Sequence, residues 1–301
     1  NETGGLSAAL MSTGGALVSR AVAAPFEYPL SRAVTLLQVE GANKRLGKPD
    51  VAFTGLFDVL RQTHSTHGVG AQFRGIAFWL TIPTVLGPVS TAVNLACKDA
   101  AKSIFPKYNP KSQFAQFLGV NMASGAVGGL ATLPLGIIST WPVVLARADL
   151  RPEVNRLGGF GHCARILRPA NLPNCVSTAV RVVPISAIGT MLSTSVSFGV
   201  FDTISGPRNM RVMGKIALAQ STLLVASAIS YPFLLISNRL IVANSFHGAK
   251  VNGWTSVKQC VSSVVEKHGF KGLWRGFPAT IFLSVSSAVA MVTYDYAKAK
   301  F

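Results

Sequence analysis

Long runs without a charged residue alternate along the chain with shorter segments that carry most of its charge. A helix needs about 20 predominantly apolar residues to cross a bilayer. The uncharged runs cover 76–97, 112–146, 182–201, 216–238 and 276–294, and a further apolar stretch opens at 3–19. The pattern predicts an all-α membrane protein with six transmembrane helices, the first of them interrupted by Arg20, Glu27 and Arg32.

The composition excludes an ordinary soluble enzyme. Of the 301 residues, 13% are charged and 49% are apolar, whereas globular domains carry about 25% charged residues. No nucleophile and base stand at a catalytic spacing, so we predict no enzyme activity, no catalytic residue and no cofactor. His64 and His67 are three residues apart, as metal ligands can be, but no third ligand accompanies them, and we predict no metal site.

The charge of the connecting segments predicts an orientation. Segments 39–74, 147–181 and 239–275 carry net charges of +2, +4 and +5, whereas 98–111 and 202–215 carry +3 and +2. The positive-inside rule places the more basic set on the side of the negative compartment. With six spans, both termini lie on the other side.

The chain contains an internal repeat of about 100 residues. An aromatic residue, a His-Gly pair and an aromatic-Arg-Gly triplet recur with the same separations in two places. The recurring residues are Phe53, His67-Gly68 and Phe73-Arg74-Gly75 in one copy, and Trp254, His268-Gly269 and Trp274-Arg275-Gly276 in the other. We predict three hairpin repeats, at 1–110, 111–208 and 209–301, of which the second is divergent.

Prolines and acids recur in the predicted spans as well. Each odd span carries a proline, at Pro29, Pro142 or Pro232, and each even span ends near an acid, at Asp99, Asp202 or Asp295. With the segments AVNLACKDAAKSIF (92–105), FLGVNMASGAVGG (117–129) and GFKGLWRG (269–276), the chain resembles the mitochondrial carrier family, and within it the ADP/ATP carriers.

The resemblance implies a three-fold pseudosymmetric bundle of six helices in the mitochondrial inner membrane, with short helices on the matrix face. The matrix face is then the more basic one, in agreement with the charge count, and both termini face the intermembrane space. The glycines at 125–129 are expected to serve close helix packing.

The matrix-side gate of the family is degenerate in this chain. In the family, each odd helix carries Pro-x-Asp/Glu-x-x-Lys/Arg, and the acids and bases pair into a ring. The resemblance places these positions at Pro29, Ser31 and Val34, at Pro142, Val144 and Arg147, and at Pro232, Leu234 and Ser237. Five of the six charges are missing, so the ring cannot form.

The gate on the opposite side is better kept. Even helices of the family end in an acid followed three residues later by a base, which fits Asp99 with Lys102 and Asp295 with Lys298. Asp202 lacks the base, since Ser205 stands there. The alternative is that these are solvated helix-end charges of little energetic value.

Two further groups of residues carry predictions. Arg20 and Glu27 are intramembrane charges seven residues apart, which form either a functional site or a polar pair facing the bundle axis. The triplets Phe73-Arg74-Gly75 and Trp274-Arg275-Gly276 precede even helices, where free backbone N–H groups attract phosphate. The resemblance implies bound cardiolipin at both, and the alternative is an interfacial aromatic residue with a snorkelling arginine.

The nucleotide contacts of the ADP/ATP carriers are not kept. The third proline is followed by Ser237-Asn238-Arg239-Leu240-Ile241-Val242 in place of three arginines and three methionines, and no Lys or Arg falls between Gly75 and Lys98. We therefore expect a carrier-like protein that has lost nucleotide exchange and serves as an accessory structural subunit of a respiratory-chain or ATP synthase assembly. The expected partners are membrane lipids and subunits of that complex, with no nucleic acid. The alternative is an active solute carrier with a small, weakly charged substrate and polar gates.

Overall fold

The computed structural model describes residues 24–25, 27–40, 53–73, 75–106, 108–110, 112–148, 172–205, 212–245, 256–281 and 283. These residues form helices and short connections and contain no strand, which confirms the predicted all-α class. A helical segment at 27–38 comes first. The elements that follow are α3 (Leu56–His67), η1 (Val69–Phe73), α4 (Ile76–Ile104), α5 (Phe114–Ala148), α7 (Leu172–Ser205), α8 (Val212–Ser245), α9 (Val257–His268) and η4 (Phe270–Trp274).

Within these ranges, four helices are long and apolar enough to cross a membrane. The spans are Trp79–Ile104, Phe114–Ala148, Thr178–Ser205 and Gly214–Ala243, and they correspond to the second to fifth predicted spans. The helices are longer than the roughly 20 residues that a bilayer requires, so they are tilted or extend beyond its apolar core. Most of the predicted first and sixth spans lies outside the described residues.

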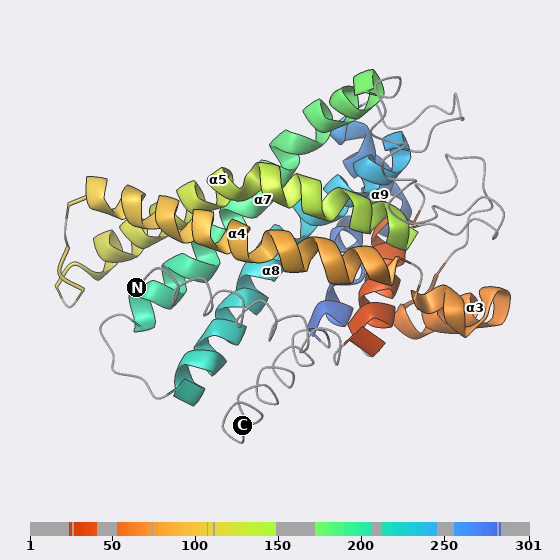
Figure 1. Cartoon of the computed structure of the whole chain (residues 1–301), viewed down its shortest axis with the longest axis horizontal. Helices are drawn as coiled ribbons and strands as arrows, with labels where there is room; N and C mark the ends of the chain where they lie inside the picture. The colour runs from red at the N-terminus through yellow and green to blue at the C-terminus, as the bar shows by residue number, and fades with distance from the viewer. Residues whose placement is uncertain are drawn as a thin grey trace, which may run out of the picture.

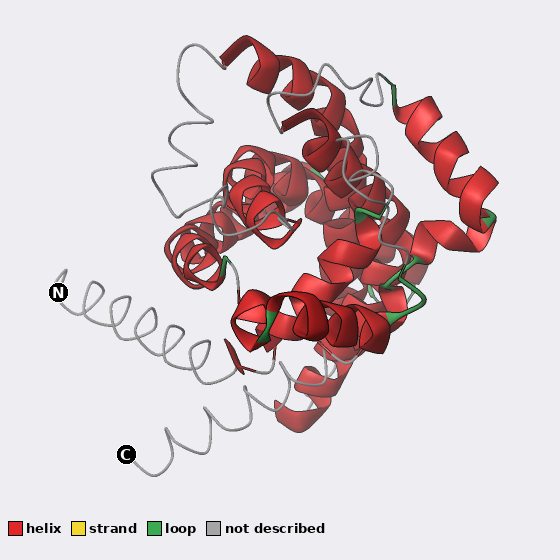
Figure 2. Ribbon diagram, turned by 90° about the vertical axis from the view of Figure 1, so that its right-hand side faces the viewer, coloured by secondary structure: helices red, strands yellow, loops and turns green. Residues whose placement is uncertain are grey.

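The long helices pack side by side in chain order. α4 packs along α5, α5 along α7 and α7 along α8, while α8 also contacts α9 and η4. Figure 1 shows α3 and α9 at the same end of the bundle, where α4 begins and α5 and α8 end. Viewed from that end, the helices are arranged around a common centre (Figure 2).

The two short helices have the same arrangement in the two places where the sequence motif recurs. α3 with η1 and α9 with η4 have the same lengths and the same separation, offset by 201 residues. Ser256 precedes α9 as its N-cap, and its side chain accepts a hydrogen bond from the N–H of Gln259. In α3 the Asp58 carboxylate instead accepts the N–H of Thr54, and this bond, with a further one from Gln62, holds the pKa of Asp58 below its usual value.

Small residues bring α4, α5 and α7 into close contact, as expected for the glycines at 125–129. A Cβ atom on Gly125 would lie 2.8 Å from the carbonyl oxygen of Thr194 on α7, and one on Gly128 would lie 2.8 Å from the carbonyl oxygen of Asn94 on α4. Gly199 of α7 faces Met122 of α5 in the same way. Since lipid offers no hydrophobic driving force between helices, this close backbone packing helps to hold them together.

The glycine of each aromatic-Arg-Gly triplet packs on the tyrosine that precedes a proline of an odd span. Gly75 and Gly276 have φ angles of +84° and +90°, a region that favours glycine. A Cβ atom on Gly75 would lie 2.8 Å from the hydroxyl of Tyr28, and one on Gly276 would lie 2.8 Å from the hydroxyl of Tyr231. The first and third repeats therefore share one three-dimensional arrangement as well as one sequence motif.

Candidate functional site

A cavity of about 440 Å³ lies between α5, α7 and α8. Twelve of its 22 described lining residues carry a hydroxyl group, and no charged side chain is among those 22. The hydroxyl-bearing residues are Ser90, Thr132, Thr140, Ser186, Thr190, Ser193, Thr194, Ser227, Ser230, Tyr231, Ser237 and Thr280. The described lining is thus uncharged, with hydroxyl groups set in a largely apolar wall.

Several of these hydroxyls already donate their proton to a backbone carbonyl of their own helix. Thr132 donates to Gly129, Thr194 to Thr190 and Ser230 to Ala226, at 3.0, 2.8 and 2.8 Å. This is the usual behaviour of Ser and Thr inside helices. A hydroxyl that donates in this way keeps its oxygen lone pairs as acceptors, so the lining favours a molecule that brings hydrogen-bond donors.

Two of the positions that the resemblance assigns to the first gate, Ser31 and Ser237, make neutral hydrogen bonds. Ser237 Oγ on α8 accepts a hydrogen bond of 3.2 Å from Ser186 Oγ on α7, and both serines line the cavity. Ser31 donates to the carbonyl oxygen of Tyr28 on its own helix at 2.9 Å. Among the other positions, Val34 and Val144 are buried and Leu234 lines the cavity.

Arg147 is the one base kept at the six charge positions of that gate, and it lies against an aromatic ring. Its guanidinium carbon is 5.4 Å from the ring centroid of Tyr28, at the distance of a cation–π contact. The neighbouring Arg32 is buried and donates from Nε to the carbonyl oxygen of Arg147 at 3.1 Å. Sequence reasoning missed Tyr28, although an aromatic residue directly precedes each of the three prolines (Tyr28, Trp141 and Tyr231).

At the opposite end of the bundle, the ends of α4 and α7 are joined by ion pairs. Asp202 Oδ2 lies 2.6 Å from Lys102 Nζ and 3.2 Å from Lys98 Nζ. The Lys98 side chain is 8% exposed and its ammonium group lies 4.9 Å from the ring centroid of Phe198. The structure thus brings together Lys102 and Asp202 from the predicted set, whereas Asp99 is exposed.

Lys98 was missed by sequence reasoning, although its spacing of four residues from Lys102 places both on one face of a helix. Asp295 and Lys298, the third pair of this gate, lie outside the described residues, as does Arg20. Glu27 is partly buried in the helical segment at 27–38. His64 is exposed. Within the described ranges, no group of three His, Cys, Asp or Glu side chains is placed so that it could hold a metal ion.

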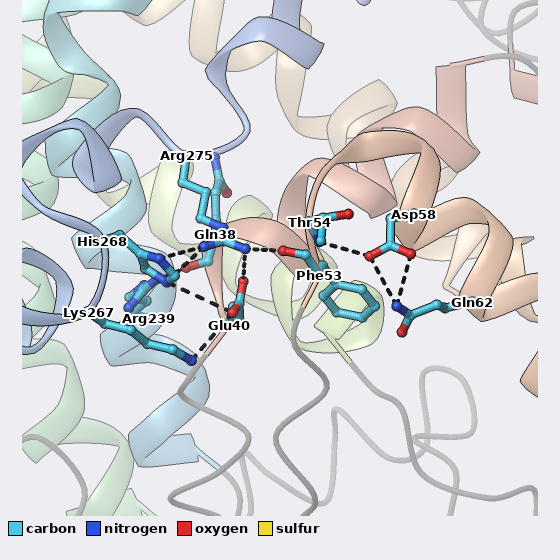
Figure 3. A network of polar contacts seen from close by, with 10 residues as sticks. All are labelled: Gln38, Glu40, Phe53, Thr54, Asp58, Gln62, Arg239, Lys267, His268 and Arg275. Atoms are coloured by element: carbon cyan, nitrogen blue, oxygen red, sulfur yellow. Dashed lines mark hydrogen bonds and ion pairs between the residues drawn. The ribbon is translucent and has the colours of Figure 1, made fainter.

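The aromatic-Arg-Gly triplet at 274–276 faces the protein interior. Trp274 Nε1 donates to the carbonyl oxygen of Ala228 at 2.8 Å, and the guanidinium group of Arg275 lies 2.5 Å from Glu40 Oε2. Arg275 also donates to the carbonyl oxygen of Phe53 and contacts His268 (Figure 3). The Arg275 side chain is therefore held by protein groups and does not snorkel, while Arg74 of the first triplet is outside the described residues.

Comparison with known proteins identifies the family. The family model for mitochondrial carrier proteins matches residues 7–109 and 208–301, and the chain belongs to this family. It is 28% identical to the ADP,ATP carrier protein of Parachlorella kessleri, over 95% of this chain and 82% of that protein. It is 27% identical to human ADP/ATP translocase 3, over 93% of this chain and 94% of the translocase. Mitochondrial carriers are multi-pass inner-membrane transport proteins, so this chain is an inner-membrane protein of that class.

The part of the chain outside the family match contains most of the cavity wall. Residues 110–207 are not covered by the family model, and α5 and α7 lie within them. The family model thus matches the ranges that contain α3, α4, α8 and α9, and the remaining ten lining residues lie within those ranges.

Proposed function

We propose that this chain is a mitochondrial carrier for a small polar solute that is uncharged or weakly charged, and that it does not exchange ADP for ATP. The observation that carries the proposal is the cavity of about 440 Å³, lined by hydroxyl groups and, among its described residues, by no charged side chain. A volume of this size suits a small molecule.

The same lining argues against a nucleotide. A di- or triphosphate gives up its water only where several fixed cations and donors replace it. Three basic side chains near the ends of the bundle, Lys98, Lys102 and Arg275, lie beside carboxylates, and Arg147 lies against Tyr28. None of these four lines the cavity.

Polar contacts between helices support a working gate. The Ser186–Ser237 bond and the 2.7 Å bond from Asn238 Nδ2 to Gln38 Oε1 join helices near the positions where the family uses ion pairs. A neutral hydrogen bond contributes only about 0.5–1.5 kcal/mol net. Such bonds can break and re-form as the cavity opens, which is what a polar gate requires.

Thermal stabilisation of the purified, lipid-supplemented protein tests this function. We expect at least one neutral or zwitterionic compound rich in hydroxyl, amide or ammonium donors to raise the unfolding temperature, and ADP and ATP to leave it unchanged. A ligand present at a concentration 100 times its dissociation constant raises the free energy of unfolding by about 2.7 kcal/mol. Compounds that stabilise the protein are then assayed for uptake into proteoliposomes.

A matched pair of variants distinguishes the cavity from the lipid-facing surface. Ser193→Leu fills the cavity and should abolish the stabilisation, whereas Ser221→Leu on the exposed face of α8 should preserve it. Stabilisation by ADP with carrier-like ADP/ATP exchange would overturn the proposal. So would a panel in which no compound stabilises the protein.

The missing gate charges support a second function, in which the chain has lost nucleotide exchange and serves as an accessory structural subunit of a respiratory-chain or ATP synthase assembly. A native gel of mildly solubilised mitochondria distinguishes the two. Migration with such a complex at fixed stoichiometry, together with an empty compound panel, favours the subunit. Migration alone favours the carrier.

The orientation and lipid contacts belong to the same proposal. The net charge of the segments that contain α3 and α9 supports a matrix location for this end, with both termini toward the intermembrane space. Cardiolipin would then bind the backbone N–H groups that follow Gly75 and Gly276, at the N-terminal ends of their helices.

A further inference from the structure

A buried carboxylate at the α9 end of the bundle is surrounded by basic side chains. The side chain of Glu40 is 2% exposed. Its Oε2 lies 2.5 Å from Arg275, and its Oε1 lies 3.4 Å from Lys267 Nζ and 3.9 Å from His268 Nε2. We call these four residues the Glu40 cluster; Figure 3 shows them together with Gln38 and Arg239.

The Glu40 cluster joins the first repeat to the third. Glu40 lies two residues after the helical segment at 27–38, whereas Lys267 and His268 end α9 and Arg275 follows η4. Further bonds cross the same boundary: Arg275 donates to the carbonyl oxygen of Phe53, and Arg239 of α8 donates to that of Gln38 at 2.6 Å. Two segments more than 200 residues apart are thus held together at one end of the bundle (Figure 1).

The burial of Glu40 and the partial exposure of its basic partners favour ion pairs that can break when the two repeats separate. A carboxylate as buried as Glu40 pays a large desolvation penalty unless cations and hydrogen bonds compensate it. Arg275 is 18% exposed and Lys267 is 42% exposed, so water reaches the cationic side of the cluster. If the two repeats separate, water can hydrate the carboxylate as well as the cations, and the ion pairs break without leaving a dry, unpaired charge.

We propose that the Glu40 cluster is the lock that closes the α9 end of the carrier, in place of the ionic ring that Ser31, Val144 and Leu234 cannot form. Glu40 is a positioning residue that holds the first and third repeats together while the cavity is shut off from this side. The inference rests on the proposed transport function, but its test needs no transported solute.

The test follows access to the cavity from each face of the membrane. The native cysteines Cys97, Cys163, Cys175 and Cys260 are replaced by alanine, and Ser193→Cys places one reporter thiol in the cavity. A charged, membrane-impermeant maleimide is applied to mitoplasts and, separately, to inverted inner-membrane vesicles. The labelling rate of the reporter in each preparation measures how often the cavity opens to that face.

Glu40→Gln should raise the labelling rate about tenfold from the face on which α9 lies and leave the other face unchanged, because the ion pairs of the closed state lose their anion. Glu266→Gln is the matched control: this carboxylate is exposed, adjoins Lys267 in the chain and accepts a bond from Ser262. It should leave both rates unchanged. An unchanged rate in Glu40→Gln, or an equal rise from both faces, would overturn the lock.

Two further variants keep the test decisive if Glu40→Gln folds poorly. Lys267→Gln removes the most exposed partner and should raise the same rate by a smaller factor, whereas Glu40→Arg combined with Arg275→Glu should return it toward that of the parent protein. No change in the first and no recovery in the second would contradict the lock. Because the reporter responds without a solute, the lock can fail while the compound panel succeeds, and the reverse.

Discussion

Replacing Gly125 with leucine should separate α5 from α7 and lower the free energy of unfolding by about 3 kcal/mol. A Cβ atom at this position would lie 2.8 Å from the carbonyl oxygen of Thr194 and 3.2 Å from the Cα of Ser195. Both are backbone atoms, which cannot rotate away as a side chain can. The added side chain therefore has room only if the two helices move apart along their whole contact.

The measurement is thermal unfolding in lipid-supplemented detergent, with Gly119→Leu as the matched control. Gly119 lies on the same helix and is exposed, and a Cβ atom there would meet nothing within 4 Å. We expect a midpoint lower by about 5 °C for Gly125→Leu and a small change for Gly119→Leu. Equal midpoints for the two variants would show that α5 and α7 do not pack through Gly125.

The long helices could be predicted from the sequence because a helix that crosses a bilayer needs about 20 predominantly apolar residues. The uncharged runs at 76–97 and 112–146 became α4 and α5, which extend seven and two residues beyond their C-terminal limits. The uncharged run stops before Lys98, whereas α4 continues to Ile104, and Lys98 and Lys102 pair with a carboxylate on α7. A charge ends an apolar run but does not end a helix.

The partners of the site residues could not be predicted in the same way. Ser237, Arg147 and Asp202 were located from the family pattern, but their contacts Ser186, Tyr28 and Lys98 come from other helices. Ser186 is one of several serines on α7, and nothing local distinguishes it from the others. Which of them meets Ser237 is decided by how α7 and α8 pack.

Glu40 shows the same limit most clearly. In the sequence it is one of three acids in a connecting segment of net charge +2. Only the fold places it beside Arg275, which the motif at 274–276 had suggested for lipid. A nearly buried carboxylate is a stronger partner for a guanidinium group than a solvated lipid phosphate competing with water and salt. The lipid prediction is thereby restricted to the backbone N–H groups of that motif.

Replacing Asp202 with asparagine should destabilise the end of the bundle opposite to α9. The change leaves Lys98 and Lys102, both within 3.2 Å of the same carboxylate oxygen, without their counter-charge. Breaking a fully buried pair costs about 3–5 kcal/mol, and exposed pairs contribute about 0–1 kcal/mol. Lys98 is 8% exposed, whereas Asp202 and Lys102 are 21% and 29% exposed, so we expect a loss of about 2 kcal/mol in the free energy of unfolding.

Asp99→Asn removes the same charge from an exposed position on α4 and serves as the control. Its unfolding midpoint should stay close to that of the parent protein. Adding Lys98→Met to Asp202→Asn should recover part of the loss, because the least exposed unpaired charge is then gone. Equal midpoints for Asp99→Asn and Asp202→Asn would contradict a structural role for the bridge.

Asp202→Asn also tests whether the two ends of the carrier open independently. If the Asp202 bridge closes the end opposite to α9, then Asp202→Asn should raise the labelling of the Ser193→Cys reporter from that opposite face, whereas Glu40→Gln raises it from the α9 face. The structure holds both contacts at once, and alternating access requires that each can be weakened without the other. A rise from both faces in either variant would instead indicate a bundle that loosens as a whole, and only a rise from one face in each variant supports two gates.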